Sequence, residues 1–234
     1  MKFIKLSVAA MAILFASCSN NEPKSAETNN TEKVASVENG LEAVNTPEEA
    51  MNRLMEGNAR YVADSSLFPH HDLKRVATTA PHQAPFAAVV GCSDSRVPVE
   101  LIFDQGVGDI FVIRTAGNSV NDDVVMGSVD YAVEHLGVKA VIVLGHESCG
   151  GVTGAISESE KDDDSKVDEL LDVIRKDVEP YVGKADSLDA AVKMNADAQV
   201  KRIMASKHVQ KLVEEGKLTV KAGYYNVHSG KVDF

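Results

Sequence analysis

Three short runs of uninterrupted apolar residues set the pattern of the chain. They occupy residues 86–90, 110–113 and 140–144, and a glycine directly follows the first and the third. Runs of this length without alternation are typical of strands that are buried on both faces. Between the second and third runs, apolar residues recur at helical spacing, which predicts a helix capped by Asn121 and closed by Gly137. Strand, helix and strand in this order predict a parallel sheet covered by helices.

Further elements are predicted on both sides of this unit. Thr46 has the features of a helix N-cap, because a proline and then Glu49 follow it, and Glu49 can complete a capping box. That helix is expected to end near Asp64. Amphipathic stretches predict two more helices, over residues 167–178 and 188–212.

The C-terminal segment predicts a strand over 218–227, a turn over 228–230 and a short strand over 231–234. The expected fold class is therefore α/β, with a central, mostly parallel β-sheet flanked by helices and a C-terminal edge strand. Residues 46–234 are expected to form it as one domain.

The composition argues against two classes of protein, those that bind nucleic acid and those that span a membrane. The chain has 234 residues, of which 44% are hydrophobic and 25% charged, which is enough for one well-buried core. The formal net charge of −11 argues against nucleic acid, because a phosphate backbone requires a basic surface. No stretch approaches the roughly 18–20 apolar residues of a membrane-spanning helix.

Residues 1–17 have the pattern of a signal peptide. Lys2 and Lys5 precede an apolar stretch at residues 6–16, and small residues then lead into Cys18. This pattern resembles a bacterial lipoprotein signal, in which Cys18 is lipidated and begins the mature chain. The alternative is a simple secretory peptide, with Cys18 as an incidental thiol. The lipoprotein interpretation predicts a periplasmic protein that is held at a bacterial membrane by this N-terminal lipid anchor only.

Residues 18–45 are rich in Asn, Glu, Ser and Thr and contain no aromatic residue. Such a segment cannot bury enough apolar surface to offset the entropy lost on ordering, so it is interpreted as a flexible tether. The domain that begins at residue 46 then contains two cysteines, Cys92 and Cys149.

Chemically active side chains follow the first and third apolar runs. Cys92, Asp94 and Arg96 come directly after the first run, and His146 and Cys149 come after the third. Parallel strands end at the same edge of a sheet, so these side chains are expected to converge at its carboxyl edge. Two cysteines and one histidine form a three-ligand zinc set whose fourth tetrahedral position is left for water, as in catalytic zinc sites.

Two other interpretations stay open on the residues alone. In an exported protein two cysteines ordinarily suggest a disulfide, although a disulfide gives no reason for Asp94, Arg96 and His146 to gather at the same edge. The glycine-rich segment 145–154 also suggests a phosphate cradle, but it lacks the lysine of a P-loop and the spacing of a dinucleotide fingerprint.

The two motifs together resemble those of the β-class carbonic anhydrases. Cys-Ser-Asp-Ser-Arg at 92–96 is followed by His-x-x-Cys-Gly-Gly at 146–151, and Arg-Thr-Ala-Gly-Asn at 114–118 and Asp-Tyr-Ala-Val at 130–133 also match. The likeness extends from about residue 46 to the C-terminus. It implies a carbonate dehydratase, a lyase that reversibly hydrates CO2 to bicarbonate and a proton by means of zinc-bound hydroxide.

The resemblance implies a role for each residue of the motifs. Cys92, His146 and Cys149 would bind one Zn²⁺ per subunit. Asp94 would accept a hydrogen bond from the hydroxide, while Arg96 holds the Asp94 carboxylate through a bidentate pair. If Arg96 releases it, Asp94 would become a fourth metal ligand and close the site.

The resemblance also implies residues that bind the substrate. Gln83 would hydrogen-bond it, although Gln83 is otherwise readable as a simple loop residue, and the backbone N–H of Gly150 would face the bound oxygen. Phe111, Ala116 and Tyr131 match the apolar CO2 pocket, which in the family is completed across a dimer interface. A homodimer or homotetramer is therefore expected. Ala116 departs from the bulkier valine of plant-type members.

Further expectations concern regulation, proton transfer and competing functions. Members with an inhibitory bicarbonate site have a tryptophan where this chain has Val89, and the chain contains no tryptophan, so we predict that this regulation is absent. The chain has seven histidines and no pattern selects a proton shuttle among them, so His135 is named only as one candidate. The alternatives are a carbon disulfide hydrolase-like enzyme on the same scaffold, or a non-catalytic zinc- or anion-binding lipoprotein. The Asp94–Arg96 pair argues against the second, because metal storage needs neither residue.

Overall fold

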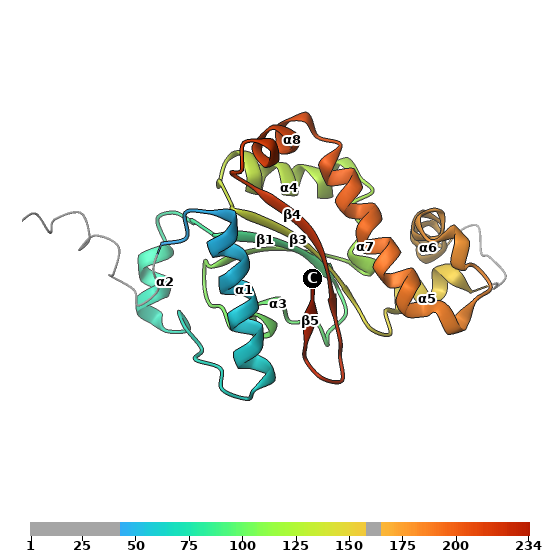
Figure 1. Ribbon diagram of the computed structural model, residues 1–234, viewed down its shortest axis with the longest axis horizontal. Helices are drawn as coiled ribbons and strands as arrows, with labels where there is room; N and C mark the ends of the chain where they lie inside the picture. The colour runs from blue at the N-terminus through green and yellow to red at the C-terminus, as the bar shows by residue number, and fades with distance from the viewer. Residues whose placement is uncertain (1–42, 158–164) are drawn as a thin grey trace, which may run out of the picture. The chain divides into compact units, whose positions relative to one another are not determined.

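A computed structural model describes residues 43–157 and 165–234 (Figure 1). The predicted signal peptide (residues 1–17), the lipidation site Cys18 and nearly all of the predicted tether (18–45) lie outside these described residues, so they stay predictions. Among the residues described, no helix is both long enough and apolar enough to cross a membrane.

The described residues form one five-stranded sheet in the order β2-β1-β3-β4-β5. Strands β1 (Ala87–Cys92), β2 (Ile110–Thr115), β3 (Ala140–His146) and β4 (Thr219–Tyr225) are parallel, and β5 (Val232–Asp233) pairs antiparallel with β4 at the edge. The predicted fold class is confirmed, including the C-terminal edge strand. Strands β1 and β3 extend two residues beyond their apolar runs, so each ends on a residue of the predicted zinc set.

Helices lie on both sides of the sheet, with α1 and α3 on one side and α4, α7 and α8 on the other (Figure 1). Short 3-10 turns connect several of them, and η1 (Ala116–Asn118), which directly follows β2, is the one that matters for the site. The helices are α1 (Pro47–Val62), α2 (Leu73–Thr79), α3 (Val99–Ile102), α4 (Asp123–Glu134), α5 (Gly150–Ile156), α6 (Lys166–Asp177), α7 (Leu188–Met204) and α8 (Lys207–Glu214).

The core follows from the alternation of side chains along the buried strands. Val89 of β1 and Ile142 of β3 point to the face that α1 and α3 cover, whereas Val90 and Val143 point to the opposite face. All four side chains are fully buried. Because both faces are covered, residues 87–90 of β1 and 140–144 of β3 are all apolar, which explains the uninterrupted runs in the sequence.

The predicted capping box of α1 is present, but the start of α4 differs from the prediction. The N-cap of α4 is Asp122, not Asn121, because one carboxylate oxygen of Asp122 accepts hydrogen bonds from the amides of Val124 and Val125, both at 2.9 Å. The Asn121 amide instead donates to the Ser119 hydroxyl.

The other helices differ from the prediction in three ways. The stretch 188–212 is two helices, α7 and α8, because Ser206 leaves the helical region with φ −65° and ψ 122°. Helix α2 was not predicted, and it buries none of its side chains, so it leaves no apolar periodicity in the sequence. Helix α3 was not predicted either, because its four residues are too few to show a period.

Candidate metal centre

Three ligand-type side chains meet where β1 and β3 end. Cys92 and His146 are the last residues of these strands, and Cys149 is the N-cap of α5. One ligand atom from each of the three lies within 4.8 Å of the others. Both cysteines are free thiols, so the disulfide considered from the sequence is not formed in this structure. The predicted convergence at the carboxyl edge is therefore present.

The His146 ring carries a buried nitrogen that is suited to bind a metal ion. His146 is fully buried, and its Nδ1 donates a hydrogen bond to the carbonyl of Glu147 at 2.9 Å. That bond leaves the lone pair on Nε2, which is buried without a hydrogen-bond partner. An unsatisfied buried polar group costs about 1–3 kcal/mol, and a ring nitrogen fixed through its other N–H is typical of metal-binding histidines. The donor set therefore fits a metal ion.

The two thiols differ in their affinity for a proton. The sulfur of Cys92 accepts hydrogen bonds from the backbone amides of Asp94 and Gly117, both at 3.4 Å. Hydrogen bonds from the Cys149 thiol and from these two amides outweigh burial and hold the pKa of Cys92 well below its ordinary value. The same contact, together with burial, raises the pKa of Cys149. Negative charge therefore gathers on Cys92 first, and a bound cation would deprotonate the second thiol as well.

Asp94 is held by Arg96 beside the three ligand-type side chains. One oxygen of its carboxylate accepts from Nε and the backbone N–H of Arg96, at 3.0 and 2.9 Å, and the other accepts from Nη2 at 2.7 Å. These hydrogen bonds lower the pKa of Asp94 to about 2, so it is ionised at neutral pH. The nearer Asp94 oxygen lies 4.0 Å from Nε2 of His146.

A further arginine whose role the sequence did not reveal fixes the loop after β1. Arg114 of β2 donates to the carbonyls of Cys92 (3.0 Å) and Asp94 (2.6 Å). Arg96 also donates to the carbonyl of Ser148 at 3.2 Å, and Ser148 has a left-handed φ of 56°. In the sequence, Arg114 is recognisable only as part of a motif. Its contacts join β2 to the end of β1 and the loop after it, and no local spacing indicates them.

Two of the five predicted substrate-binding residues lie at this edge. Ala116 is the first residue of η1, directly after Thr115, which is the β2 partner of Cys92. Gly150 is the first residue of α5, directly after Cys149.

The other three residues are not brought to the ligands within one chain. Phe111 pairs with Ala88, four residues before Cys92, which places it about 13 Å away along the strand. Tyr131 of α4 packs against Phe111, with ring centroids 6.1 Å apart, and His135 packs against Tyr131 in turn. Gln83 is exposed and precedes the amino end of β1, the end of the sheet opposite the ligands.

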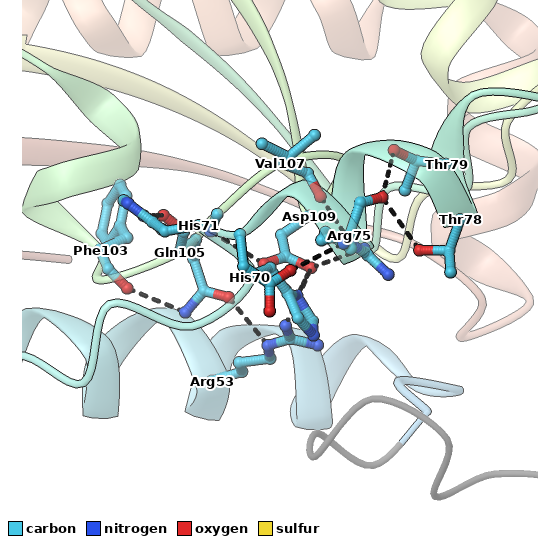
Figure 2. Close-up of polar contacts among 12 residues, drawn as sticks. Arg53, His70, His71, Arg75, Thr78, Thr79, Phe103, Gln105, Val107 and Asp109 are labelled. Atoms are coloured by element: carbon cyan, nitrogen blue, oxygen red, sulfur yellow. Dashed lines mark hydrogen bonds and ion pairs between the residues drawn. The ribbon is translucent and has the colours of Figure 1, made fainter.

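A second charged cluster surrounds Asp109, which directly precedes β2. Figure 2 shows three side chains converging on this carboxylate, which is only 3% exposed: Arg53 of α1, Arg75 of α2, and His70 from the segment before α2. The distances from Asp109 to His70 Nδ1, Arg75 and Arg53 are 2.8, 3.1 and 3.2 Å, and the N–H of Gly106 donates at 2.9 Å. The cluster joins α1, α2 and the sheet, and no sequence pattern indicates it because its members are far apart in the chain.

Comparisons with known proteins place the fold and the motifs in a family. The family model described as "Carbonic anhydrase" matches residues 87–232. A carbonic anhydrase of Pseudomonas aeruginosa is 33% identical over 199 residues, which cover 78% of this chain and 86% of that protein. A carbonic anhydrase of Mycolicibacterium smegmatis is 49% identical over 111 residues, or 47% of this chain, and the match spans only about half (53%) of that relative.

A solved structure agrees with the sequence relatives. The structure of the Coccomyxa β-carbonic anhydrase in complex with acetazolamide matches with a TM-score of 0.61 and 28% identity. The match covers 82% of this chain and 86% of that one. The parallel sheet, the strand-end motifs and the family model thus agree, and the chain belongs to the β-class carbonic anhydrase family.

Proposed function

We propose that the protein catalyses the zinc-dependent, reversible hydration of CO2 to bicarbonate and a proton. The observation that carries the proposal is the buried, unpartnered Nε2 of His146, which lies with two thiols beside an arginine-bound carboxylate. Two thiolates and one imidazole are ligands that zinc prefers, and a set of three leaves one position open. When bound, zinc acidifies water and so supplies a nucleophile at neutral pH.

The other residues of the site orient the reactants. Asp94 is ionised at neutral pH, so its carboxylate can only accept a hydrogen bond and can thereby hold a water molecule in one orientation. Arg96 keeps that carboxylate in place through two parallel hydrogen bonds. We assign the backbone N–H of Gly150 as a donor to a substrate oxygen. Arg96 holds Asp94 outside the group of three ligands that would bind the ion, and release by Arg96 would let the Asp94 carboxylate become a further ligand.

We further propose that the CO2 pocket is completed by a second copy of the chain, in a homodimer or homotetramer. Gln83, Phe111 and Tyr131 lie far from the ligands of their own chain, and 44% of Tyr131 is exposed. Those residues would serve the ligands of the partner, and the alternative is that they have no part in the site. Analytical ultracentrifugation tests this proposal: a monomer with full CO2 hydration activity would contradict it.

We also propose that Cys18 is lipidated and that the protein is anchored to a bacterial membrane and faces the periplasm. The support is the pattern of residues 1–18 alone. The variant Cys18→Ser should move the protein from the membrane fraction to the soluble fraction and abolish labelling by a radioactive fatty acid. A labelled, membrane-bound Cys18→Ser variant would contradict the proposal.

Stopped-flow CO2 hydration tests the proposed activity. The wild-type protein should hydrate CO2 far above the uncatalysed rate, and the Cys92→Ser variant should not. Wild-type activity no higher than that of Cys92→Ser would contradict the proposal. The same proteins assayed for hydrolysis of carbon disulfide separate the two substrates, since hydrolysis without CO2 hydration would favour the carbon disulfide enzyme. A wild-type protein that binds zinc but acts on neither substrate would favour a binding protein.

A further inference from the structure

One of the two amides that donate to the Cys92 sulfur belongs to Gly117, in η1. Gly117 has a φ of +65°, in the left-handed region that favours glycine, and a Cβ added there would come within 2.6 Å of the Ile174 side chain. Only glycine therefore fits at this position without strain. Its N–H donates to Cys92 and its carbonyl faces α7.

The carbonyl of Gly117 is held by a side chain that is fully buried. Asn195 of α7 is 0% exposed, and its Nδ2 donates to that carbonyl at 2.8 Å. The Asn195 Oδ1 accepts from Nε2 of Gln199 at 3.1 Å, one helical turn further on and equally buried. The Gln199 Oε1 in turn accepts from the N–H of Val120 at 3.1 Å. The two amides thus hold both ends of the segment 117–120 against α7.

The outer end of this network is ionic. The Gln199 Nε2 also donates to the Asp177 carboxylate at 2.9 Å, and Arg202 forms an ion pair with the same carboxylate. Asp177 is the last residue of α6, so the network joins α6, α7 and η1. Buried amides cost free energy unless they are hydrogen-bonded, so such networks hold one arrangement of the chain only when their members are satisfied.

We propose that Asn195, supported by Gln199, is a positioning residue of the metal centre. Its side chain fixes Gly117 in the orientation that donates a hydrogen bond to the Cys92 sulfur. That bond orients the sulfur lone pairs toward the other two ligands, in the way that outer hydrogen bonds tune metal ligands. The inference rests on the proposed zinc site. It gives α7, a helix outside the sequence motifs, a role in the affinity of that site for zinc.

The test measures zinc affinity by competition with a chromophoric chelator, on the full chain. Asn195→Asp keeps the size of the side chain but replaces the donor by a second acceptor, and Asn195→Leu removes both polar atoms. Ile203→Ala is the matched control, because Ile203 lies on the same helix, is also fully buried and has only apolar contacts in its cluster. Circular dichroism confirms that each variant is folded under the conditions used.

Both Asn195 variants should bind zinc about 10- to 100-fold more weakly than the wild type, whereas Ile203→Ala should stay within about twofold. The cobalt(II)-substituted Asn195→Asp protein should also show a shifted sulfur-to-metal charge-transfer band, which the control should not. If Asn195→Leu does not fold, Asn195→Asp decides the test alone. Zinc affinity and cobalt spectrum equal to those of the control would overturn the inference. A wild-type protein that binds no zinc would instead overturn the proposed function.

Discussion

The two ends of the parallel sheet each carry a buried polar cluster with an arginine-bound carboxylate, and they differ in what is left unsatisfied. At the amino end, Asp109 is paired by two arginines, by His70 and by a backbone N–H. At the carboxyl end, Nε2 of His146 has no partner, although the ring is fully buried. Buried charge alone therefore does not distinguish a functional site from a structural one, whereas an unpartnered histidine nitrogen beside two thiols indicates a metal site.

Loss of a metal ligand at the carboxyl end should have the largest effect on activity. Cys92→Ser or Cys149→Ser should remove zinc and lower kcat/KM for CO2 hydration by about 10⁴-fold, or more than about 5 kcal/mol of transition-state stabilisation. Stopped-flow assays and elemental analysis measure both quantities. Cys18→Ser serves as the control, because this cysteine lies outside the ligand set, and it should keep the zinc. Retained zinc and activity in both ligand variants would contradict the assignment.

Substitution of Asp109 in the amino-end cluster should lower stability and leave catalysis unchanged. Asp109→Ala leaves Arg53, His70 and Arg75 without their buried anion, so the free energy of unfolding should fall by about 3–5 kcal/mol. Urea denaturation measures it, with Asp186→Ala, in an exposed turn, as the control. Activity per folded molecule should stay near the wild-type value. A variant that is stable but inactive would show that the cluster takes part in catalysis.

The Asp94 carboxylate should matter for the rate while leaving the metal in place. Asp94→Asn keeps the shape but loses the charge and one acceptor, so hydration should slow by about 10²-fold, near 2.7 kcal/mol. Zinc content should not change, because Asp94 is bound to Arg96 and lies outside the three-ligand group. Loss of zinc from this variant would instead indicate that Asp94 is itself a ligand.

Acid should weaken the fold through carboxylates that have depressed pKa values. Burial alone would raise the pKa of Asp104, but hydrogen bonds from the amides of Leu67 and Phe68 and from Arg60 outweigh it and hold this pKa below its ordinary 3.8. A depressed pKa stabilises the folded state above the ordinary value, and this stabilisation is lost as the pH falls through the folded-state value. Urea midpoints should therefore fall between pH 5 and pH 3.

The matched variant for this pH dependence is Asp104→Asn, which has no proton to bind at that position. Its urea midpoint should be lower at pH 6 and should depend less on pH than that of the wild type. Parallel pH curves for the two proteins would show that Asp104 does not contribute to the acid sensitivity.

The smallest effect is expected at the exposed pair beside the ligand loop. Glu147 accepts from the ring of His228 (2.8 Å) and from the N–H of Val227 (3.1 Å), but 80% of the His228 side chain is exposed. Exposed ion pairs contribute little to stability, so His228→Ala should leave the urea midpoint nearly unchanged and alter hydration by less than about twofold. A tenfold loss of hydration would show that nearness to the ligand loop outweighs exposure.

The sequence predicted the parts of this protein that depend on local pattern and on parallel topology. The buried strands are visible as apolar runs, and the convergence of Cys92, His146 and Cys149 follows once those strands are parallel neighbours. What it missed depends on contacts between distant residues, such as those of Arg114 with the loop after β1 and of Asn195 with Gly117.

Other limits of the prediction have different physical causes. Helix α2 is held by polar contacts such as that of Arg75 with the Val107 carbonyl, and it leaves no apolar period to detect. The motif match placed Gln83, Phe111 and Tyr131 in a pocket, but within one chain these residues lie away from the ligands. A sequence pattern gives positions along a chain and does not say which copy of the chain contributes each side chain.

X-ray absorption at the zinc edge, on the purified full chain, tests whether Cys92, His146 and Cys149 hold a metal ion. We expect one zinc ion per chain, bound by two sulfur atoms, one imidazole nitrogen and one oxygen atom. A metal-free protein in which Cys92 and Cys149 are joined to each other would contradict it.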